Sequence, residues 1–71
     1  MEYLVIVEKS DAGFGAYVPD LPGCVAVGDS RPEVIKLIRE AIELHIEDMK
    51  ERGDAVPPPS SQSELVAVHA A

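Results

Sequence analysis

The spacing of hydrophobic positions changes along the chain, and each change predicts an element. An unbroken apolar run from Tyr3 to Val7 predicts a strand over about residues 2–9. Because apolar side chains fall on both faces of this run, we expect a central strand that is covered on both sides. Shorter apolar stretches predict strands over about 14–18 and 24–28, and the turn residues from Ser10 to Gly13 join the first two strands in a hairpin.

The spacing then becomes helical, with start and stop signals at its two ends. Ser30 is a favourable N-cap, Pro32 suits the first turn, and Glu33 completes a capping box. Gly53 is typical of the residue that follows a helix. These signals predict one helix over about residues 31–52.

The apolar positions of this helix form an arc wider than one sheet face requires. Around the helix axis they cover an arc of about 200°, whereas a helix that packs on one sheet face needs an apolar stripe of roughly 100°. The excess indicates that a second subunit covers part of the helix, and the candidate subunit-interface residues are Leu37, Leu44 and His45. His45 could also be a metal ligand or a pH-sensitive contact, but a hydrogen-bonded core or interface histidine is favoured because no cluster with metal-ligand spacing accompanies it.

A proline-rich connector over residues 56–63 follows the helix, and mild alternation predicts a fourth strand over about 64–69. The order β-β-β-α-β belongs to the α+β class. A right-handed crossover would place the fourth strand parallel to the first, in a mixed four-stranded sheet of order 3-2-1-4 with the helix on one face. We expect a single domain over residues 1–71, and this order resembles part of the ribonuclease H-like fold.

The segment from Tyr17 to Cys24, which we call the elbow, carries the most unusual backbone chemistry. Two prolines restrict the chain, and Gly23 after Pro22 suits a type II turn. We expect a stiff loop that displays Asp20 and Leu21 for recognition, since a stiff loop loses little entropy on binding. The alternative is a plain connection between strands. The candidate partner-binding residues are Tyr17, Asp20, Leu21, Pro22 and Gly23.

Composition and charge disfavour some classes of function and favour others. Six basic and thirteen acidic residues give a formal net charge of −7, which disfavours direct binding to nucleic acid and suits a basic partner. One cysteine and no apparent signal or membrane-spanning segment indicate a cytoplasmic protein without membrane association. A chain of 71 residues buries a small core, so association into a homodimer or homotetramer is expected.

The candidate catalytic groups lack the neighbours that catalysis needs. Cys24 could pair with His45 or His69 as a nucleophile and base, but no basic residue stands beside it to lower its pKa. A nuclease of the ribonuclease H type needs carboxylates on its strands for two metal ions, and the interior of the first strand carries none. We therefore predict no enzyme, no catalytic residue, no metal and no cofactor.

Several motifs resemble those of the HicB-like antitoxin family, specifically its N-terminal domain. They are the strand and elbow from Gly13 to Cys24, the helix start Gly28-Asp29-Ser30, and the helical segment Arg39-Glu40-Ala41-Ile42. The resemblance covers about residues 2–52. It implies the β-β-β-α-β fold, and an acidic antitoxin of a type II toxin–antitoxin pair that binds and occludes a HicA-type toxin, a small basic messenger-RNA interferase with a catalytic histidine.

The resemblance also leaves one alternative open. Many family members continue into a C-terminal DNA-binding domain, whereas this sequence ends at Ala71. We therefore keep as an alternative a stand-alone homo-oligomeric interaction or regulatory module without a cognate toxin.

Overall fold

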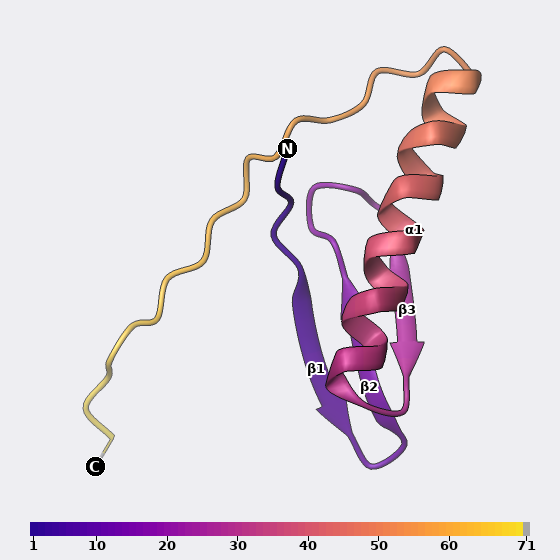
Figure 1. The fold of residues 1–71 in the computed structure, drawn as a ribbon. Helices are drawn as coiled ribbons and strands as arrows, with labels where there is room; N and C mark the ends of the chain where they lie inside the picture. The colour runs from indigo at the N-terminus through magenta and orange to yellow at the C-terminus, as the bar shows by residue number, and fades with distance from the viewer. Residues whose placement is uncertain (71) are drawn as a thin grey trace.

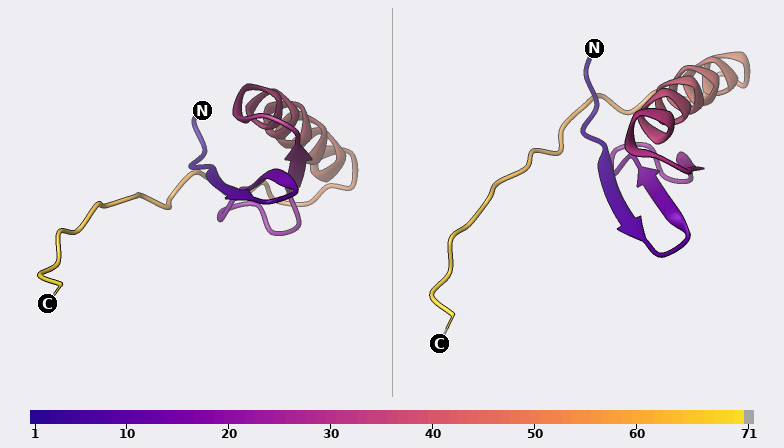
Figure 2. Two further views of the ribbon diagram at one scale, coloured as in Figure 1. Left: turned by 90° about the horizontal axis from the view of Figure 1, so that it is seen from below. Right: turned by 60° about the horizontal axis from the view of Figure 1, so that its bottom comes forward.

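Three antiparallel strands and one long helix make up the fold. The computed structural model describes residues 1–70, and Figure 1 shows β1 (Ile6–Ser10), β2 (Gly13–Tyr17), β3 (Val25–Gly28) and α1 (Arg31–Glu51). The sheet has the order β1-β2-β3, and α1 lies against one of its faces (Figures 1 and 2). The α+β class, the first three strands and their order are confirmed. Residue 71, the last of the predicted domain, lies outside the described part.

The register of the strands assigns each side chain to one face of the sheet. Val7 lies opposite Ala16, and Ala16 lies opposite Ala26. Ala16 is buried in the core under α1, so this row of residues faces the helix. Because side chains alternate along a strand, the neighbouring row, which runs from Ile6 through Tyr17 to Val25, faces away from it.

Two expectations for the first strand are wrong. The strand begins at Ile6 rather than near residue 2, and it lies at an edge of the sheet rather than at its centre. The physical reason is pairing: Ile6 is opposite Tyr17, the last residue of β2, and the chain beyond Tyr17 turns into the elbow. Residues 3–5 therefore have no neighbouring strand along β2.

The ends of α1 follow the predicted signals closely. The Ser30 Oγ accepts a hydrogen bond from the Glu33 N–H at 3.2 Å, and the Glu33 carboxylate accepts one from the Asp29 N–H at 3.0 Å. At the other end Gly53 has φ +76°, its N–H donates to the Lys50 carbonyl, and the next N–H donates to the Met49 carbonyl. This pair of bonds is a Schellman motif, which satisfies carbonyls that the last helical turn leaves free.

The predicted fourth strand is absent from the described residues. After α1 the chain is extended, and residues 52–70 contain no strand. Figure 2 shows the last part of this segment leaving the body of the molecule and diverging from the sheet in both views. A strand is stabilised by a neighbour and by a covered face, and residues 64–69 have neither here. Among the described residues, no helix is long and apolar enough to cross a membrane.

Candidate protein-interaction surfaces

The elbow consists of two consecutive β-turns. The Leu21 N–H donates to the Val18 carbonyl at 3.0 Å, which closes a first turn around Pro19. The Cys24 N–H donates to the Leu21 carbonyl at 3.0 Å, and Gly23, with φ +85°, occupies the position of a type II turn that needs a positive φ. A further bond from the Val18 N–H to the Cys24 carbonyl joins the two ends of the loop. The predicted turn geometry is confirmed.

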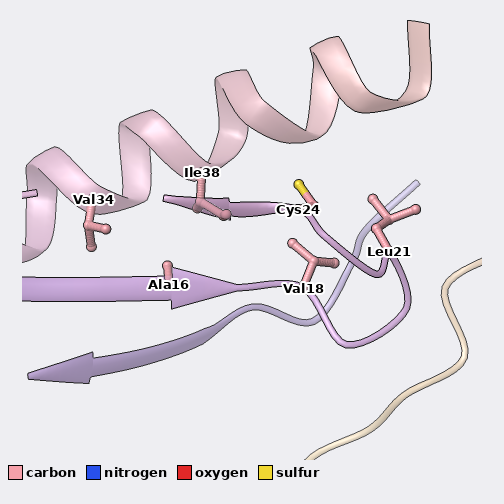
Figure 3. Close-up of a cluster of buried hydrophobic side chains, with 6 residues drawn as sticks. All are labelled: Ala16, Val18, Leu21, Cys24, Val34 and Ile38. Atoms are coloured by element: carbon pink, nitrogen blue, oxygen red, sulfur yellow. The ribbon is translucent and has the colours of Figure 1, made fainter. Parts of the chain in front are cut away.

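Leu21 does not project from this loop. It is fully buried, with 0% of its surface exposed, and the expectation that it is displayed for recognition is wrong. Figure 3 shows Leu21 turned inward beside Val18 and Cys24, in the same cluster as Val34 and Ile38 of α1. The two turns reverse the chain so that its most apolar side chain closes one end of the core, where burial of a leucine contributes about 1.5–3 kcal/mol.

Asp20 holds the segment that follows the helix. Its carboxylate accepts hydrogen bonds from the backbone N–H of Ser60 at 2.8 Å and of Ser61 at 2.9 Å. The two serine hydroxyls donate to the other carboxylate oxygen at 3.2 and 2.7 Å. We call this group of four bonds the clasp. The Tyr3 hydroxyl donates to the Pro57 carbonyl nearby, so residues 57–61 are fixed against the elbow and the N-terminal segment.

The clasp predicts a specific acid response. Hydrogen bonds from the Ser61 hydroxyl and N–H, and from Ser60, hold the pKa of Asp20 at about 2, below its ordinary value of 3.8. Because the folded pKa is the lower one, the clasp is fully present above pH 3.8 and is lost as the pH falls towards 2. NMR shifts of the Ser60 and Ser61 amides should therefore change with a midpoint near pH 2, and this change should vanish in Asp20→Asn. A midpoint near 3.8 in the native chain would contradict the clasp.

An apolar patch on the outer face of the sheet was not singled out from the sequence. Tyr17, Val25 and Val27 are 41, 64 and 78% exposed, and the half-buried Ile6 lies opposite Tyr17 in the register. Gly15, opposite Val27, adds no side chain to the row. We call Ile6, Tyr17, Val25 and Val27 the outer patch. The apolar character of both faces of the first strand was the signal for it, because it indicated that something covers this second face.

The remaining elbow candidates border the outer patch. Tyr17 ends β2 and belongs to both regions, while Pro22 and Gly23 are exposed at the turn. The structure therefore brings Tyr17, Pro22 and Gly23 together at an accessible end of the molecule. Asp20, engaged in the clasp, and Leu21, in the core, point to structural roles.

The candidate subunit-interface residues lie on α1, and two of them lie beside the start of β3. Leu44 is 67% exposed, whereas Leu37 and His45 are half-buried. Leu44 and His45 line a shallow depression together with Cys24 and Val25. This depression extends the outer apolar surface around the β3 edge of the sheet.

Cys24 behaves as a core residue. It is 3% exposed, and burial raises the pKa of its thiol, which keeps it in the neutral and less nucleophilic form. Within the part of the chain that the structure describes, no group of three or more His, Cys, Asp or Glu side chains could hold a metal ion. The most exposed apolar feature of the sheet is the outer patch.

Comparison with solved structures gives a close counterpart for this fold. A chain of the HicA3 and HicB3 toxin-antitoxin complex superposes with a TM-score of 0.72 at 33% identity, over 83% of this chain and 70% of that chain. At this identity the likeness extends to sequence as well as to fold.

Relatives from distant organisms match the same chain. A UPF0150 protein of Thermoplasma acidophilum is 37% identical over 71 residues, which cover 99% of this chain and 100% of the relative. A UPF0150 protein of Synechocystis is 45% identical over 56 residues, or 78% of this chain and 71% of the relative. A 14.9 kDa protein of Haemophilus phage HP1 is 40% identical over 57 residues, and the matched part spans only 43% of its length.

The family itself follows from a match over nearly the whole sequence. The model described as the HicB-like antitoxin of bacterial toxin-antitoxin systems matches residues 3–70. This range includes the elbow, the helix and the segment after it, and so extends beyond residues 2–52, on which the motifs alone could be recognised. The chain belongs to the HicB-like antitoxin family of bacterial toxin–antitoxin systems.

Proposed function

We propose that this protein is a cytoplasmic antitoxin that binds a HicA-type toxin and blocks its active surface, and that it acts by binding rather than by catalysis. The observation that carries the proposal is the likeness to a chain of the HicA3 and HicB3 complex, at a TM-score of 0.72 and 33% identity. The family match over residues 3–70 supports the same role.

The outer patch is the surface that we propose for the toxin. Contiguous exposed apolar side chains rimmed by polar groups mark interaction sites on small proteins. Tyr17, Val25 and Val27 offer such a patch on a rigid sheet, and the stiff turn at Pro22 and Gly23 extends it. Tyrosine at such a site supplies a large contact area with few rotatable bonds.

Charge favours the same partner. The chain carries a formal net charge of −7, and a HicA-type toxin is basic. Opposite net charges accelerate encounter and orient the two proteins, while the apolar patch supplies most of the contact that holds them together. We also propose that the protein is a homodimer or homotetramer, in which Leu37, Leu44 and His45 contact another subunit.

A growth assay tests the function. The full chain is co-expressed with a HicA-type toxin in bacteria, and we expect growth that the toxin alone arrests to be restored. A toxin whose catalytic histidine has been replaced serves as the control, because cells should then grow with or without the chain. Growth arrest that persists while the folded chain accumulates would overturn the proposal and favour a module without a toxin.

A further inference from the structure

β1 is an edge strand whose outer edge is unpaired in the described part of the chain. Within residues 1–70, β1 pairs with β2 alone, so its other edge presents unpaired backbone N–H and C=O groups. The helix packs over β3 and β2 and makes few contacts with β1. An open edge of this kind is a template for pairing with another strand.

An apolar groove lies beside the residues that precede β1. It has a volume of about 500 Å³ and runs between the segment that leads into β1 and one side of α1. Its apolar lining includes Val5, Ile35, Ile38, Ile42 and Ile46. A strand added to β1 would place alternate side chains into this groove, because side chains of a strand alternate between the two faces of a sheet.

The segment after the clasp is extended and apolar but has no strand beside it in the described structure. Residues 62–70, which we call the tail, are extended and exposed along their whole length. Leu65, Val66 and Val68 are 98, 73 and 80% exposed, so most of their apolar surface is uncovered in the single chain. Nine extended residues reach about 30 Å, which is longer than the five residues of β1 require.

We propose that the tail of one copy pairs with the free edge of β1 in a second copy and lays its apolar side chains in the groove of that copy. The clasp favours a second copy over the same chain, because Asp20 holds Ser60 and Ser61 at the elbow and the tail then diverges from its own sheet (Figures 1 and 2). The exchange is reciprocal under two-fold symmetry, so both edges and both tails are covered.

The charge at the rim of the groove and the possible lengthening of β1 both favour the tail of a second copy as the occupant of the groove. Arg39 lies at the rim of the groove and offers a partner for Glu64 near the start of the tail. An added strand also gives residues 3–5 a neighbour that β2 does not provide, so β1 can lengthen toward Tyr3. The product is the four-stranded sheet of order 3-2-1-4 that the hydrophobic pattern predicts, with its fourth strand supplied by the partner copy.

The oligomeric state of the full chain tests the exchange. Light scattering at about 10 μM should give a dimer or a multiple of it, because the exchange buries the exposed apolar side chains of both tails and thereby favours association. Leu65→Asp with Val68→Asp changes one residue on each face of the tail and should raise the dissociation constant at least about a hundredfold, since a carboxylate is costly to bury. Ser63→Asp with Ala70→Asp adds the same charge to the tail and should change the constant much less.

A second measurement separates exchange from folding back. In a sample mixed from isotope-labelled and unlabelled copies, filtered NMR spectra should show contacts between tail methyl groups of one copy and those of Ile35 and Ile42 in the other. Contacts within one copy only, or none, would overturn the proposal. So would a monomeric native chain, or a dimer that the Leu65 and Val68 changes leave intact. No toxin is needed for these measurements, so their failure is separate from failure of the proposed function.

Discussion

Leu21→Ala should remove a large part of the stability of this domain. A leucine that is fully buried loses both its transfer free energy and its packing when truncated, which costs about 2–5 kcal/mol. A domain of this size has roughly 4–10 kcal/mol in total. Urea denaturation followed by circular dichroism should therefore show a much lower midpoint, or a chain already partly unfolded in buffer.

Leu44→Ala provides the matched control, because it makes the same chemical change at a position that is 67% exposed. Its effect on the free energy of unfolding of the monomer should stay within about 0.5 kcal/mol. Both variants are measured at a protein concentration low enough to keep the chain monomeric, because Leu44 is a proposed subunit contact and self-association contributes to apparent stability. Equal midpoints for the two variants would show that Leu21 is not part of the core.

Val27→Lys should weaken toxin binding by at least about tenfold while the domain stays folded. Val27 is 78% exposed at the outer patch, so lysine costs little in the free protein. In the complex, the ammonium group would replace apolar contact and would face a basic partner, and about 1.4 kcal/mol of lost interaction corresponds to a factor of ten. Isothermal titration of a catalytically inactive HicA-type toxin measures the change.

Glu47→Lys distinguishes this surface from the acidic outer face of α1. It introduces a lysine at an exposed position on the helix, and we expect a smaller loss of affinity that disappears at high salt. If Glu47→Lys abolished binding and Val27→Lys did not, the toxin would dock on the helix instead of on the sheet.

Local signals in the sequence were sufficient for the elements whose stability is local. The helix begins at the Ser30 cap and ends with the Gly53 motif because side-chain and backbone donors there satisfy the orphan groups of the helix. The hairpin and the type II turn at Pro22 and Gly23 likewise depend on residues close in sequence. These features were predictable without knowledge of the rest of the fold.

Features that depend on distant neighbours were not predictable. The pattern of Leu65 to Val68 predicts a strand, but a strand forms only where the segment lies against a free edge and a covered face, and in the single chain the tail diverges from the sheet. Leu21 looked exposed because it follows Pro19 and Asp20 in a polar turn, yet the second turn directs it into the core. The clasp joins residues forty positions apart, which no local pattern could reveal.

The outer patch was predictable from the sequence only in part. Apolar residues on both faces of the first strand indicated a second covering layer, but they could not say which residues of the neighbouring strands would join it. The register supplies that information by placing Ile6 beside Tyr17 and Tyr17 beside Val25.

The most direct test of the antitoxin role is a binding titration of the purified full chain with an inactive HicA-type toxin. We expect saturable binding with a defined stoichiometry and a Kd below about 1 μM, which corresponds to a free energy of about −8 kcal/mol or better. Binding should also suppress RNA cleavage by the active toxin in the same concentration range. A folded chain that neither binds the toxin nor slows its cleavage of RNA would contradict the account.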